Sequence, residues 1–233
     1  MIKNIIISGL TALAFSACAV NDNSMYTVVQ ESGKRGLLNN EKGLVIKPIY
    51  DSVNVYFDDD GKEFELVEYN KKFGIITRDS KLLLKPIYDY IKPFFNGFAT
   101  ISLDGKVGLI NNKFEIILKP KYVELHEFYN EVAYVKATSG LYGCIDKKMN
   151  LKIKPIFDRI YIEKEGYSRV LKDKKWGVID SQCNILVKPR YDYMHEFSQG
   201  LAKVEYNGKF SYINTKGELI TDIIFENGDD FYQ

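Results

Sequence analysis

Short apolar runs separated by polar turns recur along most of this 233-residue chain. In the stretch from Gly200 to Phe231, apolar and polar residues alternate in LAKVEYN, an Asn-Gly pair follows, and KFSYIN and ELIT are two further apolar segments. Alternation with a period of two predicts half-buried β-strands, and Asn-Gly favours a tight hairpin because both residues tolerate positive φ. The pattern therefore predicts a meander of three short strands.

The meander pattern repeats in phase at a spacing of roughly 34 residues, with a slightly longer first step. A glycine marks each copy at Gly36, Gly74, Gly108, Gly143 and Gly177, with Ser211 in the sixth. A Lys-Pro pair follows, with proline at Pro48, Pro86, Pro120, Pro155 and Pro189, and Ile223 in the sixth. Two residues later comes an aromatic residue, at Tyr50, Tyr88, Tyr122, Phe157, Tyr191 and Phe225. Each of these sets of equivalent positions forms a column of the repeat. Because the columns recur together, with the same spacing between them, in six copies, they define a structural repeat.

Each column of the repeat has an expected role. Glycine at Gly177 and its equivalents is expected at a bulge or where a neighbouring ring passes close to the backbone. Proline ends a strand or marks a sheet edge, because it cannot donate to a ladder. The aromatic residue is expected to fill the core between units. The acidic residue after it suits a turn, where its carboxylate accepts backbone N–H groups; it stands at Asp51, Asp89, Asp158, Asp192 and Glu226, with Val123 the exception.

This vocabulary resembles the WG-repeat family of bacterial proteins, also called KWG repeats, over roughly Met25 to Gln233. The resemblance rests on the aromatic-glycine pair, the Pro-x-Tyr/Phe-Asp segment and a closing stretch seen here as FFNGFA, FYNEVA and FSQGLA. We expect an all-β fold of six β-meander repeats in an open curved array, since the outer copies depart from the pattern as capping units do. A six-bladed propeller-like closure is the alternative, although 34 residues is short against the about 40–45 residues of a typical blade.

Residues 1–18 differ from the repeats. Lys3 precedes an apolar stretch from Ile5 to Phe15, and small residues lead to Cys18. This layout predicts a secretory signal peptide, because the apolar run is too short to span a membrane. Its end resembles a bacterial lipobox, which implies lipidation of Cys18 and, without Asp at Ala19, an outer-membrane lipoprotein facing the periplasm. Cleavage by ordinary signal peptidase, giving a soluble periplasmic protein, is the alternative.

The predicted domains are thus a signal peptide over residues 1–18, a polar tether over 19–25 and the repeat domain over 26–233. Hydrophobic residues make up 45% of the chain and aromatic residues 14%, enough for a packed core. The charge is close to balanced, with 32 basic and 31 acidic residues. The chain has no large net positive charge that would attract nucleic acid or anionic lipid. Membrane contact is therefore expected through the lipid anchor only.

Catalytic and metal-binding motifs are not evident in the sequence. His126 and His195 occupy the same repeat column, too far apart to share an ion, and neither lies near a recognisable nucleophile motif. The run Asp58–Gly61 lacks the spacing of a calcium loop and predicts a solvated turn. Cys144 predicts a small core residue and Cys183 a turn residue. Because they occupy different positions in neighbouring units, the sequence gives little reason to expect a disulfide between them. We expect no cofactor and no enzyme activity.

One lysine column is the candidate binding surface: Lys47, Lys85, Lys119, Lys154 and Lys188. If the units pair edge to edge, these lysines form a ridge with a spacing of roughly 14 Å, partly neutralised by the aspartates four residues later. A second column is expected only to flank the hairpin turns: Lys34, Lys72, Lys106, Lys175 and Lys209. The expected function is a non-enzymatic scaffold of the bacterial cell envelope that binds another protein through its β surface. Binding of cell-wall glycan, or an inhibitor or immunity-type role against an envelope toxin, is the alternative.

Overall fold

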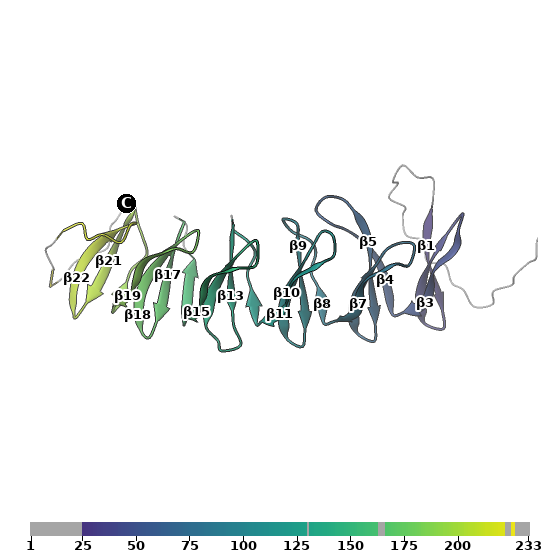
Figure 1. Ribbon diagram of the computed structural model, residues 1–233, viewed down its shortest axis with the longest axis horizontal. Coiled ribbons are helices and arrows are strands. Elements are labelled where there is room, and N and C mark those ends of the chain that lie inside the picture. Colours follow the sequence, from purple (N-terminus) through teal and green to yellow (C-terminus); the bar gives the residue numbers. More distant parts are fainter. Residues whose placement is uncertain (1–24, 130, 163–165, 222–224, 227–233) are drawn as a thin grey trace, which may run out of the picture. The chain divides into compact units, whose positions relative to one another are not determined.

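The computed structural model describes residues 25–129, 131–162, 166–221 and 225–226, and every element in this part of the chain is a β-strand. The strands form six separate antiparallel sheets, each a meander in chain order. The chain divides into two compact units, Met1–Pro120 and Lys121–Gln233. Three sheets begin in each unit (Figure 1). The prediction of an all-β fold of tandem meanders is therefore confirmed.

The first unit contains the first three sheets. The first sheet consists of β1 (Tyr26–Glu31), β2 (Lys34–Asn39) and β3 (Gly43–Tyr50). The second consists of β4 (Ser52–Phe57), β5 (Glu63–Tyr69), β6 (Lys72–Ile76) and β7 (Leu82–Tyr88). The third consists of β8 (Tyr90–Ile91), β9 (Phe98–Leu103), β10 (Lys106–Asn111) and β11 (Ile116–Tyr122), whose last two residues belong to the second unit.

The second unit continues the same scheme. The fourth sheet consists of β12 (Glu124–Leu125), β13 (Val132–Lys136), β14 (Tyr142–Asp146) and β15 (Leu151–Phe157). The fifth consists of β16 (Arg159–Ile162), β17 (Tyr167–Lys172), β18 (Lys175–Asp180) and β19 (Ile185–Tyr191). The sixth consists of β20 (Tyr193–Met194), β21 (Leu201–Tyr206) and β22 (Lys209–Asn214). The expected three-stranded unit was therefore incomplete, because an additional strand begins directly after the position of the acidic column and opens the second to sixth sheets.

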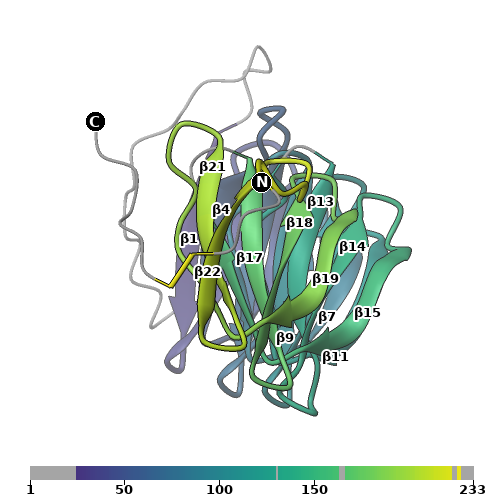
Figure 2. The same cartoon turned by 90° about the vertical axis from the view of Figure 1, so that its left-hand side faces the viewer.

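Consecutive sheets within a unit pack face to face rather than edge to edge, which corrects the pairing assumed from the sequence. In the first unit, Tyr88 of β7 packs in one core cluster with Ala99 and Ile101 of β9. In the second, Phe157 of β15 packs with Val170 of β17, and Figure 2 shows the strands of the fourth and fifth sheets overlying each other. Stacked sheets lie about 10 Å apart, so neighbouring copies are closer than the sequence estimate. Within each unit the sheets form an open series, and the aromatic column fills the core between them as predicted.

The shared phase of glycine and proline has a direct structural cause. The last strand bulges over the glycine: Phe73 pairs with Tyr88 and Ile75 with Leu84, so four residue steps on β7 face two on β6. A Cβ atom on Gly74 would lie 2.6 Å from the Leu84 oxygen, nearer than side chains approach. The prediction that the glycine lies at a bulge is confirmed. The group that comes close to the glycine is the backbone of the last strand rather than an aromatic ring. Proline falls in this bulge on an edge strand, where it blocks no ladder bond.

In the second, third and fifth sheets, a turn residue anchors the sheet to the preceding sheet of its unit. Phe114 of the third sheet inserts between Phe64 and Phe94, with ring centroids 5.3 and 5.7 Å away. Ser80 of the second sheet, at the same repeat position, donates a hydrogen bond to the Val45 carbonyl of the first. One position in the turn therefore provides different anchors in different copies.

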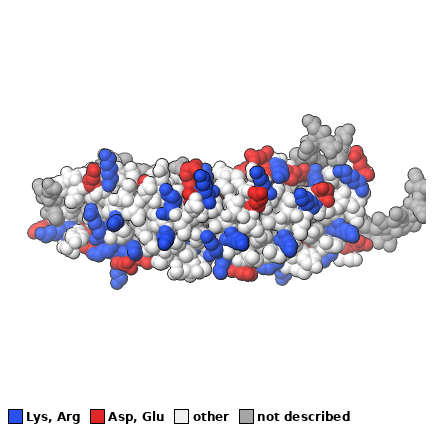
Figure 3. All heavy atoms as spheres, in the orientation of Figure 1, with Lys and Arg blue, Asp and Glu red and all other residues white. Residues whose placement is uncertain are grey.

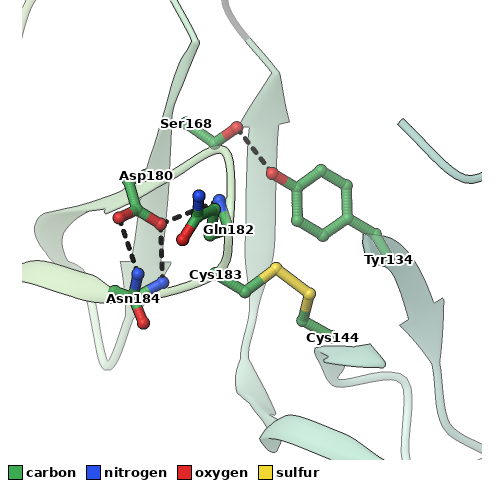
Figure 4. The surroundings of a disulfide bond; sticks show 7 residues. All are labelled: Tyr134, Cys144, Ser168, Asp180, Gln182, Cys183 and Asn184. Atoms are coloured by element: carbon green, nitrogen blue, oxygen red, sulfur yellow. Dashed lines mark hydrogen bonds between the residues drawn. A yellow bond between two sulfur atoms is a disulfide. The ribbon is translucent and has the colours of Figure 1, made fainter. Parts of the chain in front are cut away.

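Cys183 uses this turn position in the fifth sheet to form a disulfide with Cys144 of β14 (Figure 4). There was little reason in the sequence to expect this bond, and it forms because face-to-face stacking brings the turn of one sheet over the centre of its neighbour. Asp180 accepts the N–H groups of Gln182 and Asn184 and so fixes this turn. Cys144 is fully buried, as predicted for a core residue.

Candidate functional site: a lysine-bearing sheet edge

The candidate lysines all lie on the last strand of a sheet, which is an edge strand in the first five sheets. Each lysine precedes the proline at the bulge and is exposed. Lys47, Lys85 and Lys119 belong to the first unit, and Lys154 and Lys188 to the second. None of these five has an ion-pair partner among the described residues. We call this set the lysine edge, and Figure 3 shows Lys and Arg side chains on the surface of both units.

Exposed aliphatic side chains accompany the lysine edge. Three residues before each lysine stands a leucine or isoleucine with 42 to 51% of its surface exposed: Leu44, Leu82, Ile116, Leu151 and Ile185. In the first two sheets Ile49 and Ile87, two residues after the lysine, are also exposed. The edge therefore presents a cation beside apolar groups once per sheet, at a pitch of about 10 Å within a unit.

Three of the four aspartates expected to neutralise these lysines pair with the second lysine column instead. Lys34 donates to Asp51 and Lys72 to Asp89, each over 2.5 Å, and Lys175 donates to Asp192. Each of these lysines begins the strand before the last of its own sheet, and the bulge brings this strand close to the end of the last strand. The prediction that the second column only flanks hairpin turns was therefore wrong for Lys34, Lys72 and Lys175, and these three aspartates do not neutralise the lysine edge.

The same aspartates also join consecutive sheets. The Asp51 carboxylate accepts the Asn70 N–H over 2.6 Å, and Asp192 accepts the Asn207 N–H over 2.8 Å, both in the hairpin turn of the next sheet. The hydrogen bond from Lys34 lowers the pKa of Asp51, and the Asn70 N–H lowers it further. Acceptance of backbone N–H groups was the predicted role of this column and is confirmed. The lysine–aspartate pairs are thus structural.

The two histidines lie in the fourth and sixth sheets, so the whole fifth sheet stands between them. His126 lines a cleft of about 530 Å³ in the second unit, which sequence reasoning missed. The described residues contain no group of three His, Cys, Asp or Glu side chains arranged to hold a metal ion. The turn predicted at Asp58 is present, but Asp58 is buried rather than solvated, and its carboxylate accepts the N–H groups of Asp60 and Lys62.

The predicted signal peptide, Cys18 and most of the tether lie outside the described residues. Within the described residues, no helix has the length and hydropathy of a membrane span. The lipid anchor therefore remains a prediction from the sequence.

The chain was compared with curated proteins, with solved structures and with protein families. No match was found among curated proteins. Among solved structures, Kluyveromyces lactis Hsv2p is 9% identical with a TM-score of 0.32, covering 81% of this chain and 70% of that one. BamB from Moraxella catarrhalis is 10% identical with a TM-score of 0.32, covering 87% and 74%. Similarity at this level carries no information about a shared function.

Comparison with protein families identifies the repeat. The model of the WG containing repeat matches five segments, at residues 73–106, 108–138, 142–176, 176–210 and 210–233. The first sheet adds a copy with the same bulge, since a Cβ on Gly36 would lie 2.2 Å from the Ile46 oxygen. The chain belongs to the WG containing repeat family.

Proposed function

We propose that this chain is a non-enzymatic repeat scaffold of the bacterial cell envelope that binds another protein through the lysine edge. The observation that carries the proposal is the repetition, in five successive sheets, of an exposed unpaired lysine beside exposed aliphatic side chains. A polyanion would need the charge alone. The flanking leucines and isoleucines instead favour a protein partner that offers acidic and apolar side chains together.

The envelope assignment is supported by the signal-like N-terminus and by the Cys144–Cys183 disulfide, since disulfides persist in oxidising compartments outside the cytosol. An inhibitor or immunity-type role against an envelope toxin would be one form of such binding. Labelling with radioactive palmitate tests the anchor. We expect label on the wild type and none on Cys18→Ala, and equal labelling would remove the anchor from the proposal.

The binding test replaces all five lysines of the lysine edge with glutamine. The matched control replaces five exposed lysines in turns: Lys42, Lys81, Lys113 and Lys148, which precede the last strands of the first four sheets, and Lys216, which follows β22. Both variants lose the same charge. We expect the wild type and the turn variant to retain one defined envelope protein at moderate salt, and the edge variant to lose it.

Lysine and proline on an edge strand also discourage non-specific strand pairing. Solubility is therefore measured for both variants by sedimentation velocity. Retention of the same partner by a soluble, folded edge variant would contradict the proposal, as would equal loss of the partner in both variants.

A further inference from the structure

The second unit contains a cleft of about 530 Å³ that neither the repeat pattern nor the lysine edge accounts for. It lies between the first strands of the fourth and fifth sheets. Two acidic and two basic side chains line it, Glu124, Asp158, Lys136 and Arg159, together with His126 and the rings of Tyr142 and Tyr161. Its size is in the range of small-ligand sites.

The acidic and basic side chains of the cleft are equal in number, and this balance determines which class of ligand would fit. Lys136 is paired with Glu124 over 2.8 Å, and Tyr142 donates to the same carboxylate over 3.3 Å. The hydrogen bond from Lys136 lowers the pKa of Glu124, so this pair stays ionised together. Two acidic and two basic groups give the cleft no net charge that would favour an anion or a cation.

Several polar groups of the cleft remain available for a ligand. Arg159 has no carboxylate partner among the described residues, and its one hydrogen bond there is a long 3.5 Å contact to the Tyr161 hydroxyl. Asp158 accepts the Asp173 N–H through one oxygen, which leaves the other free. The ring nitrogens of His126 have no hydrogen-bond partner within the described residues. The cleft thus offers donors and acceptors beside ring faces.

A row of aromatic rings extends from the cleft across the next sheet. The Tyr161 centroid lies 5.3 Å from that of Trp176, and Trp176 lies 6.1 Å from Tyr193, which is 46% exposed. The buried Arg169 supports this row, because its guanidinium carbon lies 5.3 Å from the Trp176 ring and its Nη1 donates to the Met194 carbonyl over 2.6 Å. The rings are therefore held in place before any ligand arrives.

We propose that this cleft and the adjoining aromatic row bind a neutral oligosaccharide. A sugar ring carries many hydroxyl groups, each donor and acceptor, and apolar C–H faces that pack on aromatic rings. Polar groups of balanced charge beside a row of aromatic rings complement both features. The site is independent of the lysine edge and so extends beyond protein binding.

The test uses the purified full chain and Trp176, which is the only tryptophan of the sequence and therefore a reporter within the site. Oligomers of N-acetylglucosamine and of glucose, four to six units long, are titrated by tryptophan fluorescence and by calorimetry. We expect saturable binding of at least one series, weakened at least tenfold by Arg159→Ala and by Tyr161→Ala. Tyr206→Ala, which removes an exposed tyrosine outside the cleft, serves as the control and should bind like the wild type.

Absence of saturable binding to every neutral oligomer at millimolar concentration would overturn the proposal. Equal affinity in the folded Arg159→Ala and Tyr161→Ala variants would overturn it too. The lysine-edge variant should bind sugar normally, so failure here and failure of the protein-binding proposal are distinguishable.

Discussion

Gly177 lies directly beneath the Val187 carbonyl: a Cβ atom on this glycine would stand 2.5 Å from the Val187 oxygen. It would also lie 2.8 Å from the Pro189 nitrogen. Five sheets repeat this contact between the strand before the last and the bulge of the last strand. Glycine and Lys-Pro therefore recur together because each half of the motif requires the other.

Replacing Gly177 by alanine should destabilise the protein by about 1–3 kcal/mol, because the bulge must move away from the new methyl group. Urea unfolding followed by the fluorescence of Trp176, the adjacent residue, measures this change. An unchanged urea midpoint would show that the bulge can move without loss of stability and that close approach of the backbone is not the reason for glycine at this position.

Ser211 offers the matched control, since it occupies the glycine position in the sixth copy and already carries a Cβ. Its buried hydroxyl has no hydrogen-bond partner among the described residues. Ser211→Ala should therefore be neutral or slightly stabilising, because no buried hydroxyl then remains unsatisfied. A loss as large as that of Gly177→Ala would mean that alanine is harmful for a reason other than the bulge.

Phe114→Ala should destabilise the first unit by about 3–5 kcal/mol, since the phenyl ring is buried between two other rings. Ser80→Ala at the same repeat position removes one exposed hydrogen bond and should cost about 1 kcal/mol or less. Circular dichroism during urea unfolding compares the two variants. Equal costs would show that this turn position does not anchor the sheets through its side chain.

Reduction of the Cys144–Cys183 disulfide should lower the free energy of unfolding by about 4 kcal/mol, because the bond closes a long loop and so restricts the unfolded chain. Urea unfolding with and without dithiothreitol, followed by Trp176 fluorescence, tests this. The double variant Cys144→Ala, Cys183→Ala should show no response to reductant. Two reactive thiols in the unreduced protein would contradict the bond.

The repeat phase sufficed to predict the meander, the edge position of proline and the core role of Tyr88 and its equivalents. Columns of residues show which positions are alike in every copy. They do not show whether the next copy adds at an edge or on a face, because both arrangements give the same period. The disulfide was missed for this reason, since only face-to-face stacking places Cys183 over Cys144.

The partner of each aspartate was missed for a related reason. Lys47 and Asp51 are close in sequence, but the bulge between them turns Asp51 toward Lys34 instead. The cleft had no sequence signal at all, because Glu124 and Arg159 lie on strands of two to four residues that show no alternation. The proximity of Tyr161 to Trp176 likewise depends on how two strands of the fifth sheet lie relative to each other.

Glu65 should make the first unit less stable as pH rises. Burial raises the pKa of this carboxyl to about 8, the Asp79 charge adds to the effect, and the 3.3 Å contact with Arg78 Nε does not offset it. Between the ordinary glutamate pKa and this raised value, the unfolded chain is ionised while folded Glu65 holds its proton, so stability falls by roughly 1 kcal/mol per pH unit. Urea unfolding at pH 5.5 and pH 8 should show this loss in the wild type and a smaller one in Glu65→Gln, which cannot ionise. The same loss in both proteins would place the pH dependence elsewhere, whereas greater stability of the wild type at pH 8 would show that Arg78 holds the carboxylate ionised.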